Sequence, residues 1–220
     1  MIVCSLNEVE VYSRRAARGA GMSWGLAEEA GKASRWLAER GLPGVELLSR
    51  LLVVNDRRAY QSMAPSVVNG RWQAADGELC PVCAGAALSD HIGLLSSGKE
   101  IRLVELAYPL LLAPFLDPSW RQTDACYELR WQHARVLVFA NGLEMECAEE
   151  SAHLSEHVDT VKVSAGKHRN ASPSYRPRTA GVKIPRPVWR VMETFAERTY
   201  VPATDESRAR GAGAGRNDND

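Results

Sequence analysis

Apolar residues recur at helical spacing through the first quarter of the chain. The capping-box sequence Ser5-Leu-Asn-Glu8 precedes an amphipathic run and predicts a helix from about Leu6 to Arg18. Ser23 is a suitable cap for a second amphipathic helix, which a glycine and a proline in the segment 41–43 end. A third helix is predicted for the Leu- and Val-rich segment 44–54. Because the links are short, we expect these helices to form an antiparallel layer.

From about residue 64 the pattern changes to short runs of β-branched and aromatic residues. Asn69-Gly70 stands between two such runs in the segment 67–72, which is the strongest short signal for a β-hairpin. Similar runs predict further strands at 101–106, 108–113, 126–131, 135–140 and 160–163. The polar segment 146–156 is compatible with a helix, and apolar spacing predicts a final helix at 187–197.

These elements predict an α+β fold with an N-terminal helical layer, a mainly antiparallel sheet, a C-terminal helix and a glycine-rich tail. We expect one domain over residues 1–198, with a helical part at 1–55 and a mainly β part at 64–165. Residues 199–220 lack apolar periodicity and are rich in glycine. They are predicted to be either a flexible tail or a lid that folds over a ligand.

Composition narrows the classes of partner and compartment. The 220 residues contain 27 basic and 27 acidic side chains, so no net positive field would hold a nucleic acid or an anionic membrane. The longest apolar stretch, 107–115, contains two prolines and is too short to span a bilayer, and we expect a buried strand there. The N-terminus lacks the pattern of a secretory signal peptide, and the five cysteines are an odd number. Both observations predict a cytoplasmic chain with reduced thiols.

Several segments carry a resemblance to a known family. They are Ser5-Leu-Asn-Glu8, the stretch from Arg18 to Gly31, Cys80-Pro with Gly85-Ala-Ala-Leu-Ser-Asp90, and Tyr200-Val-Pro to Asp220. With these segments the chain resembles a bacterial family of unknown function, DUF3726, over nearly its whole length. The resemblance implies a bacterial cytosolic protein and implies no chemistry. The family pattern does not require Cys83, which implies that a metal site at Cys80-Pro-Val-Cys83 is disfavoured.

Two groups of residues have the types, but not the full pattern, of a metal or redox site. Cys80-Pro-Val-Cys83 is half of a zinc ribbon without a second pair nearby, and no helix N-terminus in a thioredoxin-like βαβ setting is predicted around it. His153 and His157 stand four residues apart, one turn after Glu149, on the helix predicted in this region. The His-Glu-x-x-His order of zincins is absent. We therefore expect no metal and no cofactor.

Three further patterns resemble functional motifs only in part. Ser89-Asp90-His91 places triad residue types side by side, whereas a triad is assembled from separated positions, so a capped turn is predicted. Gly19-Ala-Gly21 lacks the spacing of a dinucleotide-binding fingerprint and is predicted to be a turn between helices. Arg57-Arg58 belongs to a group of basic residues that we expect to be solvated surface.

The beginning of the second helix is the favoured place for a ligand. A helix N-terminus offers free backbone N–H groups and a positive dipole end to an anion, and glycines before it allow close approach. The predicted site combines this region with the tail and consists of Arg18, Gly21, Trp24, Glu28, Ser207 and Arg208. The arginines would hold a carboxylate or phosphate, Trp24 would form an apolar wall, and Glu28 is the candidate acid or base.

The predicted function is therefore that of a bacterial cytosolic protein that binds a carboxylate- or phosphate-bearing metabolite, with enzyme activity left open. The alternative is a noncatalytic accessory subunit that docks on a metabolic enzyme through its tail or a sheet edge. A small-molecule ligand or a protein partner is expected, and neither a nucleic acid nor a membrane. A tail packed over residues 19–28 would favour the ligand site, and an extended tail would favour docking.

Overall fold

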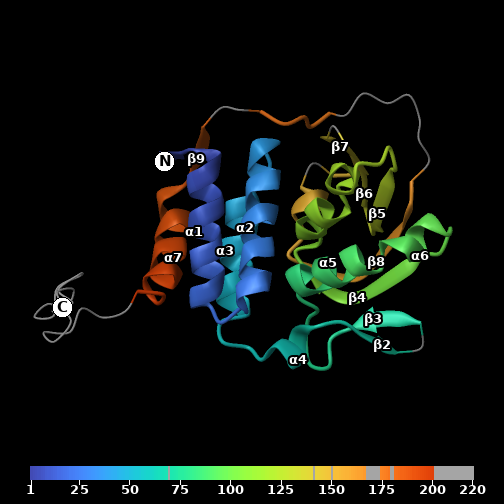
Figure 1. Ribbon diagram of the computed structural model, residues 1–220, viewed down its shortest axis with the longest axis horizontal. Helices are drawn as coiled ribbons and strands as arrows, with labels where there is room; N and C mark the ends of the chain where they lie inside the picture. Colours follow the sequence, from blue (N-terminus) through green and yellow to red (C-terminus); the bar gives the residue numbers. More distant parts are fainter. Residues whose placement is uncertain (69, 141, 150, 167–173, 179–180, 201–220) are drawn as a thin grey trace, which may run out of the picture.

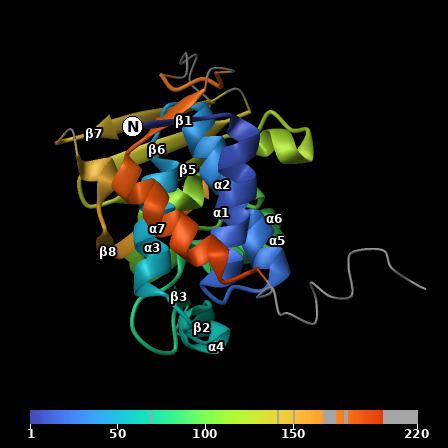
Figure 2. The ribbon, with the colours of Figure 1, turned by 90° about the vertical axis from the view of Figure 1, so that its left-hand side faces the viewer.

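The chain folds into a group of helices beside a twisted mixed sheet, with further helical segments between them (Figures 1 and 2). The computed structural model describes residues 1–68, 70–140, 142–149, 151–166, 174–178 and 181–200. Within these ranges no helix is both long and apolar enough to cross a lipid bilayer. The prediction of a tail or lid at 199–220 falls, from residue 201 onward, outside the described residues.

The helical group contains the helices predicted from the apolar pattern, so the predicted α+β class is confirmed. Its members are α1 (Leu6–Gly19), α2 (Trp24–Glu39), α3 (Gly44–Val54) and α7 (Arg186–Glu197). The capping box forms as expected: the Ser5 hydroxyl accepts from the Glu8 N–H at 3.2 Å, and the Glu8 carboxylate accepts from the Ser5 N–H at 2.7 Å. The C-terminal helix α7 packs on α1, where the rings of Tyr12 and Trp189 lie 4.7 Å apart.

The main sheet has the strand order β2-β3-β4-β8-β5-β6-β7 and is mostly antiparallel. Its strands are β2 (Ser66–Val68), β3 (Arg71–Gln73), β4 (Ile101–Ala107), β5 (Tyr127–Trp131), β6 (Ala134–Phe139), β7 (Gly142–Cys147) and β8 (His157–Ala165). The predicted hairpin is confirmed, because Val67 pairs with Trp72 across β2 and β3. A separate small sheet, β1 (Ile2–Cys4) with β9 (Val182–Ile184), was missed because its strands are only three residues long.

Strands β3 and β4 are parallel, and this pairing makes the sheet mixed. A parallel pair needs a crossover connection, and here α5 (Pro81–Asp90) and α6 (Ile92–Ser96) provide it (Figure 1). Leu79 forms a further parallel bridge to Leu106 directly before α5 begins. The sequence interpretation placed no helix between the hairpin and residue 101. The N-terminal end of α5 therefore lies in a βαβ setting, contrary to expectation.

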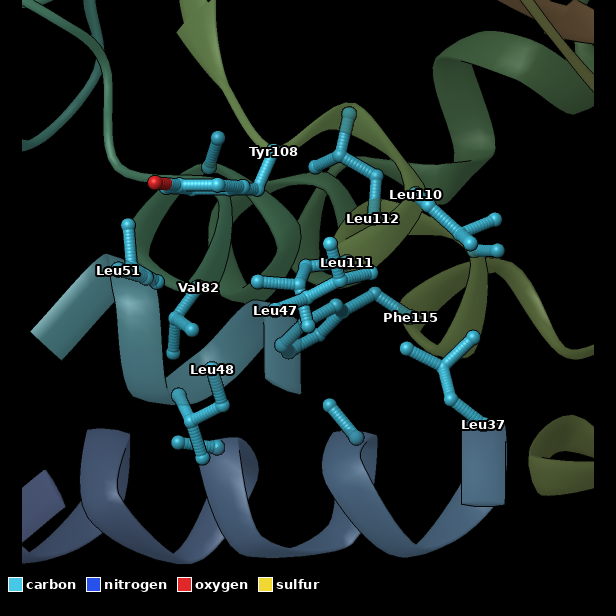
Figure 3. Packing of buried hydrophobic residues seen from close by; sticks show 14 of the residues in the cluster. Leu37, Leu47, Leu48, Leu51, Val82, Tyr108, Leu110, Leu111, Leu112 and Phe115 are labelled. Carbon is cyan, nitrogen blue, oxygen red and sulfur yellow. The ribbon is translucent and has the colours of Figure 1, made fainter. Parts of the chain in front are cut away.

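The apolar segment 107–115 is not the buried strand that its composition predicted. It forms a 3-10 helix, η1 (Pro109–Leu116), after Tyr108 in the left-handed region at φ 44°. Proline cannot donate to a strand ladder, and Pro109 and Pro114 both lie in this segment. The burial was predicted correctly, since every residue of η1 is buried. Figure 3 shows Leu111 and Phe115 of η1 pointing toward Leu47 of α3.

The segment 146–156 is also not the helix that its polarity suggested. It contains the end of β7, then a single 3-10 turn, η3 (Ala152–Leu154), before β8 begins at His157. β7 pairs with β6 in antiparallel register, with Val136 opposite Met145. Pairing with the neighbouring strand therefore decides the conformation of this region. The spacing of apolar and polar residues in the sequence does not reveal such pairing.

Candidate functional site

The turn between α1 and α2 forms one wall of a pocket. Gly21 has φ +106°, a conformation that glycine adopts without strain. Ser23 caps α2, with its hydroxyl accepting from the Leu26 N–H at 3.4 Å. The first turn of α2 contains no acidic side chain, so its positive dipole end is not neutralised locally. The turn thus has the features that the sequence predicted for an anion site.

A second wall comes from the connection after α3, which the sequence interpretation treated as solvated surface. Arg57 has φ 56°, and its N–H donates to the Ala20 carbonyl at 2.8 Å, which joins this connection to the α1–α2 turn. Arg58 donates to the Asn55 side chain at 3.0 Å and to the Asp76 carbonyl at 2.6 Å. These bonds hold the Arg58 guanidinium in place beside the turn.

Together the two walls enclose a pocket of about 310 Å³, which we call the α2 pocket. It is lined by Gly21, Met22, Ser23, Leu26, Arg58, Tyr60 and Met63. Tyr60 and Met63 belong to the short helix α4 (Tyr60–Met63). Sequence patterns gave no signal for the second wall, because it reaches the turn only through tertiary contacts.

The structure brings only some of the predicted site residues to this pocket. Gly21 lines it, whereas Arg18 lies at its edge, donating to the Met22 carbonyl at 2.8 Å. The Arg18 guanidinium is 5.1 Å from the ring of Trp24, a cation–π contact on a side chain that is 64% exposed. Glu28 is exposed and is not among the residues that line the pocket. The two predicted tail residues, Ser207 and Arg208, lie outside the described residues.

Charge distinguishes the α2 pocket from other hollows in the described part of the chain. Its lining contains a guanidinium and no carboxylate. Each of four other pockets is lined by two carboxylates: Glu29 and Asp90, Glu10 and Glu39, Glu39 and Glu46, or Glu149 and Glu156. An anion would therefore meet a cation and a helix N-terminus in the α2 pocket, without a like charge in its lining.

A backbone hydrogen bond joins the dithiol sequence to a residue of this pocket. Cys80 caps α5 and its N–H donates to the carbonyl of Met63, a pocket residue, at 3.0 Å. Both Cys80 and Cys83 are buried. The pKa of the Cys80 thiol is lowered, first by its interaction with the Cys83 thiol and further by backbone N–H groups and by Arg58. The pKa of the Cys83 thiol is raised, first by Cys80 and then by burial. The helix N-terminus that the sequence interpretation found lacking is present.

An ionic cluster surrounds His157 on β8. Its Nδ1 is 2.8 Å from a Glu78 carboxylate oxygen, and its Nε2 is 3.0 Å from Glu105 and 3.6 Å from Asp159. Ligand atoms of Glu105, His157 and Asp159 all lie within 4.8 Å of one another, an arrangement that could hold a divalent cation at an exposed position. His153 lies on the η3 turn, so the two histidines do not share a helix face as expected.

A larger groove, about 410 Å³, runs between α2, α5 and the turn η2 (Pro118–Arg121). Its lining mixes cations, carboxylates and the exposed Trp120. Ser89 and Asp90 lie in the last turn of α5, where the Ser89 hydroxyl donates to the Phe115 carbonyl at 3.2 Å. The predicted role of this pair as a turn cap is thus replaced by a position inside a helix, and its geometry offers no catalytic triad.

Beneath the groove, a buried charge network joins the end of α2 to η2. Asp117 accepts from the Trp36 indole N–H at 2.6 Å and from the Ser119 N–H at 2.8 Å, and lies 3.5 Å from the Arg40 guanidinium. Arg40 stacks 3.7 Å from the Trp36 ring, and its side chain is 3% exposed. Burial lowers the pKa of Arg40, against the opposing effect of the Asp117 and Glu39 charges.

Comparison with known proteins gives a family match over the N-terminal part of the chain and no activity. Residues 4–80 match the family model described as "Protein of unknown function (DUF3726)". No protein with curated annotation matches the chain. Among solved structures, the chain is similar to malate dehydrogenase from Entamoeba histolytica at 10% identity, with a TM-score of 0.41. This similarity covers 89% of the present chain and 61% of the dehydrogenase, so the chain spans less than two thirds of that protein.

Proposed function

We propose that the segment 4–80, which matches the DUF3726 family model, binds a small phosphate- or carboxylate-bearing metabolite in the α2 pocket. All the residues that line the pocket lie inside the matched segment. The single observation that carries the proposal is the charge of the lining, which contains Arg58 and no carboxylate. A volume of about 310 Å³ suits a metabolite of modest size.

Arg58 is well placed to be the main anion ligand. A guanidinium has five N–H donors, and among the described residues Arg58 uses two of its nitrogens, toward Asn55 and the Asp76 carbonyl. The remaining donors are available for a bidentate contact with an anion. Because those two bonds already fix the side chain, less conformational entropy is lost when the ligand binds.

The start of α2 supplies the complementary part of the site. Backbone N–H groups of its first turn and the positive end of its dipole favour an anion, and Gly21 leaves the backbone accessible. Leu26 and Met63 provide apolar contact for the remainder of the ligand. The Arg18–Trp24 pair forms the outer edge of the pocket. The roles predicted for Glu28, Ser207 and Arg208 require in addition that the tail takes part in the site.

Calorimetric titration of the full-length chain with inorganic phosphate, pyrophosphate, citrate and a nucleoside monophosphate tests the proposal. Charge-assisted hydrogen bonds contribute about 1.5–3 kcal/mol, so Arg58→Gln should weaken binding about 10- to 150-fold. Arg71→Gln, which removes an exposed arginine on β3, is the matched control and should bind as the wild type does. Arg58→Lys should retain part of the affinity, because it keeps the charge but not the bidentate geometry.

Thermal unfolding provides a second readout of the same proposal. A ligand at about 100 times its dissociation constant adds about 2.7 kcal/mol, which in a chain of this length raises the melting temperature by about 5–11 °C. A chain ending after Pro202 separates the roles of pocket and tail, since a ligand shift that disappears on truncation assigns the tail to the site. Equal binding by wild type and Arg58→Gln, or no binding by any anion, would refute the proposal and favour the docking alternative.

A further inference from the structure

The positions of Cys80 and Cys83 suit an intramolecular disulfide. Cys80 is the N-cap of α5 and Pro81 is its first residue, so Cys83 lies at the third helical position. Residues three apart on a helix have Cβ atoms about 5–6 Å apart, and the flexible cap position allows the approach to about 4 Å that a disulfide needs. A small change at the first turn of α5 therefore brings the two sulfurs to bonding distance.

The two thiols have opposite acidities. Cys80 stands at a helix N-terminus, where the dipole favours a thiolate, and its pKa is lowered, first through its interaction with Cys83. The pKa of Cys83 is raised by the same neighbour and by burial. This is the division of roles between an attacking thiol and a resolving thiol.

No other cysteine of the chain shares these properties. Burial raises the pKa of Cys4, of Cys147 and of Cys126, the last to about 11. None of these three is the cap of a helix. The reactivity that α5 gives to Cys80 is therefore specific to one thiol among the five.

Two residues that line the α2 pocket also interact with Cys80. Arg58 and Met63 line the pocket, and each also faces Cys80: the charge of Arg58 helps to lower the Cys80 pKa, and the Met63 carbonyl accepts from the Cys80 N–H. The Met63 side chain is 3% exposed and belongs to a helix of only four residues. Methionine is unbranched and flexible, so the Met63 side chain can adopt other conformations within the pocket.

We propose that Cys80 and Cys83 form a redox-active dithiol that exchanges with small disulfides through the α2 pocket. The Cys80 thiolate attacks one sulfur of a disulfide RSSR, so that a Cys80–SR mixed disulfide forms and RS⁻ leaves. The Cys83 thiol then loses its proton and attacks the Cys80 sulfur, which forms the Cys80–Cys83 bond and releases the second RS⁻. The sum is the oxidation of one dithiol and the reduction of one disulfide to two thiols. This activity does not require that an anion binds.

The first experiment uses the wild-type full-length chain equilibrated with mixtures of reduced and oxidised dithiothreitol. After an acid quench and alkylation, peptide mapping should show a loss of two hydrogens on the peptide that contains both Cys80 and Cys83. Cys126→Ser and Cys147→Ser should give the same result. A pair that stays fully reduced in the most oxidising mixture, or a disulfide that involves another cysteine, would overturn the proposal.

The second experiment separates the roles of the two thiols with 5,5′-dithiobis(2-nitrobenzoate). In Cys83→Ser, the aromatic thiol should remain attached to Cys80, whereas the wild-type pair should release two equivalents and keep none. Cys80→Ser should react about ten-fold more slowly or worse at pH 7, because Cys83 is not the N-cap residue of α5 and burial still raises its pKa when Cys80 is absent. Equal rates in the two variants would overturn the assignment of Cys80 as the attacking thiol. Circular dichroism checks the fold, and Cys83→Ala replaces Cys83→Ser if the serine variant does not fold.

Discussion

Replacing Asp117 with asparagine removes one charge from the buried network below the α2–η2 groove and preserves its shape. The Arg40 guanidinium would then remain at 3% exposure without its buried counter-ion, and its Nε already has no hydrogen-bond partner among the described residues. Glu39 remains as a partner at 3.2 Å, on a side chain that is 27% exposed. Most of the compensation for the buried charge of Arg40 is therefore lost.

Breaking a buried ion pair by removal of one partner costs about 3–5 kcal/mol. In a chain of this length each kcal/mol corresponds to about 2–4 °C, so Asp117→Asn should melt about 6–20 °C below the wild type when followed by circular dichroism. Glu100→Gln is the matched control, because it breaks an exposed pair with Arg102 at 2.8 Å. Exposed pairs contribute at most about 1 kcal/mol, and this variant should melt within a few degrees of the wild type.

A double variant tests whether an uncompensated charge is the cause. Asp117→Leu combined with Arg40→Met removes both charges and replaces them with apolar groups, which in buried pairs is often neutral or stabilising. The double variant should therefore be more stable than Asp117→Leu alone. If Asp117→Asn melts within about 1 °C of the wild type, or if the double variant is no better than the single one, the reasoning is refuted.

Two further predictions concern the helices. A Cβ on Gly85 would lie 2.2 Å from the ring of Phe115, so Gly85→Ala should lower the free energy of unfolding in urea by about 1–3 kcal/mol. Gly93→Ala is the control: a Cβ there has no atom within 4 Å, so its free energy of unfolding should be unchanged or rise by up to about 1 kcal/mol. Similar results for the two variants would contradict the contact with Phe115. The bonds from Ser5 lower the pKa of Glu8 from its ordinary 4.5. The contribution of ionised Glu8 to the stability of the folded chain is thus fully present above pH 4.5 and is lost as the pH falls through the lowered pKa of Glu8. The stability difference between wild type and Glu8→Gln should disappear in acid, and a difference that persists there would contradict this assignment.

Sequence patterns predicted the elements whose structure depends on local interactions. The capping box at Ser5 and Glu8, the caps of α2 and the amphipathic spacing of α7 each encode a helix within one or two turns. The same is true of the β2–β3 hairpin, whose turn chemistry is local. Two other segments were mispredicted. η1 was expected to be a strand because of its apolar composition, and β7 was missed because its residues are polar, although it pairs with the preceding strand β6.

The candidate site likewise has one part that local sequence patterns indicate and other parts that depend on contacts distant in sequence. The sequence indicated the N-terminus of α2 as a candidate ligand site because glycine, a cap residue and a helix start are adjacent there, and the α2 pocket adjoins it. Arg58 was not predicted, because its place beside the turn depends on the bond from the Arg57 N–H to the Ala20 carbonyl, across 37 residues. The setting of Cys80 was missed for a related reason, since the parallel pairing of β3 and β4 that makes α5 a crossover helix leaves no short-range pattern.

The contact of α7 with α1 has a consequence for the order in which the protein can fold during synthesis. Chains emerge from the ribosome N-terminus first, so α1, α2 and α3 are made long before α7. Until then the face of α1 that carries Tyr12 lacks Trp189, and β1 lacks its partner β9. The segment 4–80, which matches a family model, can therefore complete its native contacts only after α7 and β9 have been made. The nascent helical layer keeps an apolar face that chaperones can recognise, and it closes only when the end of the chain returns to its beginning.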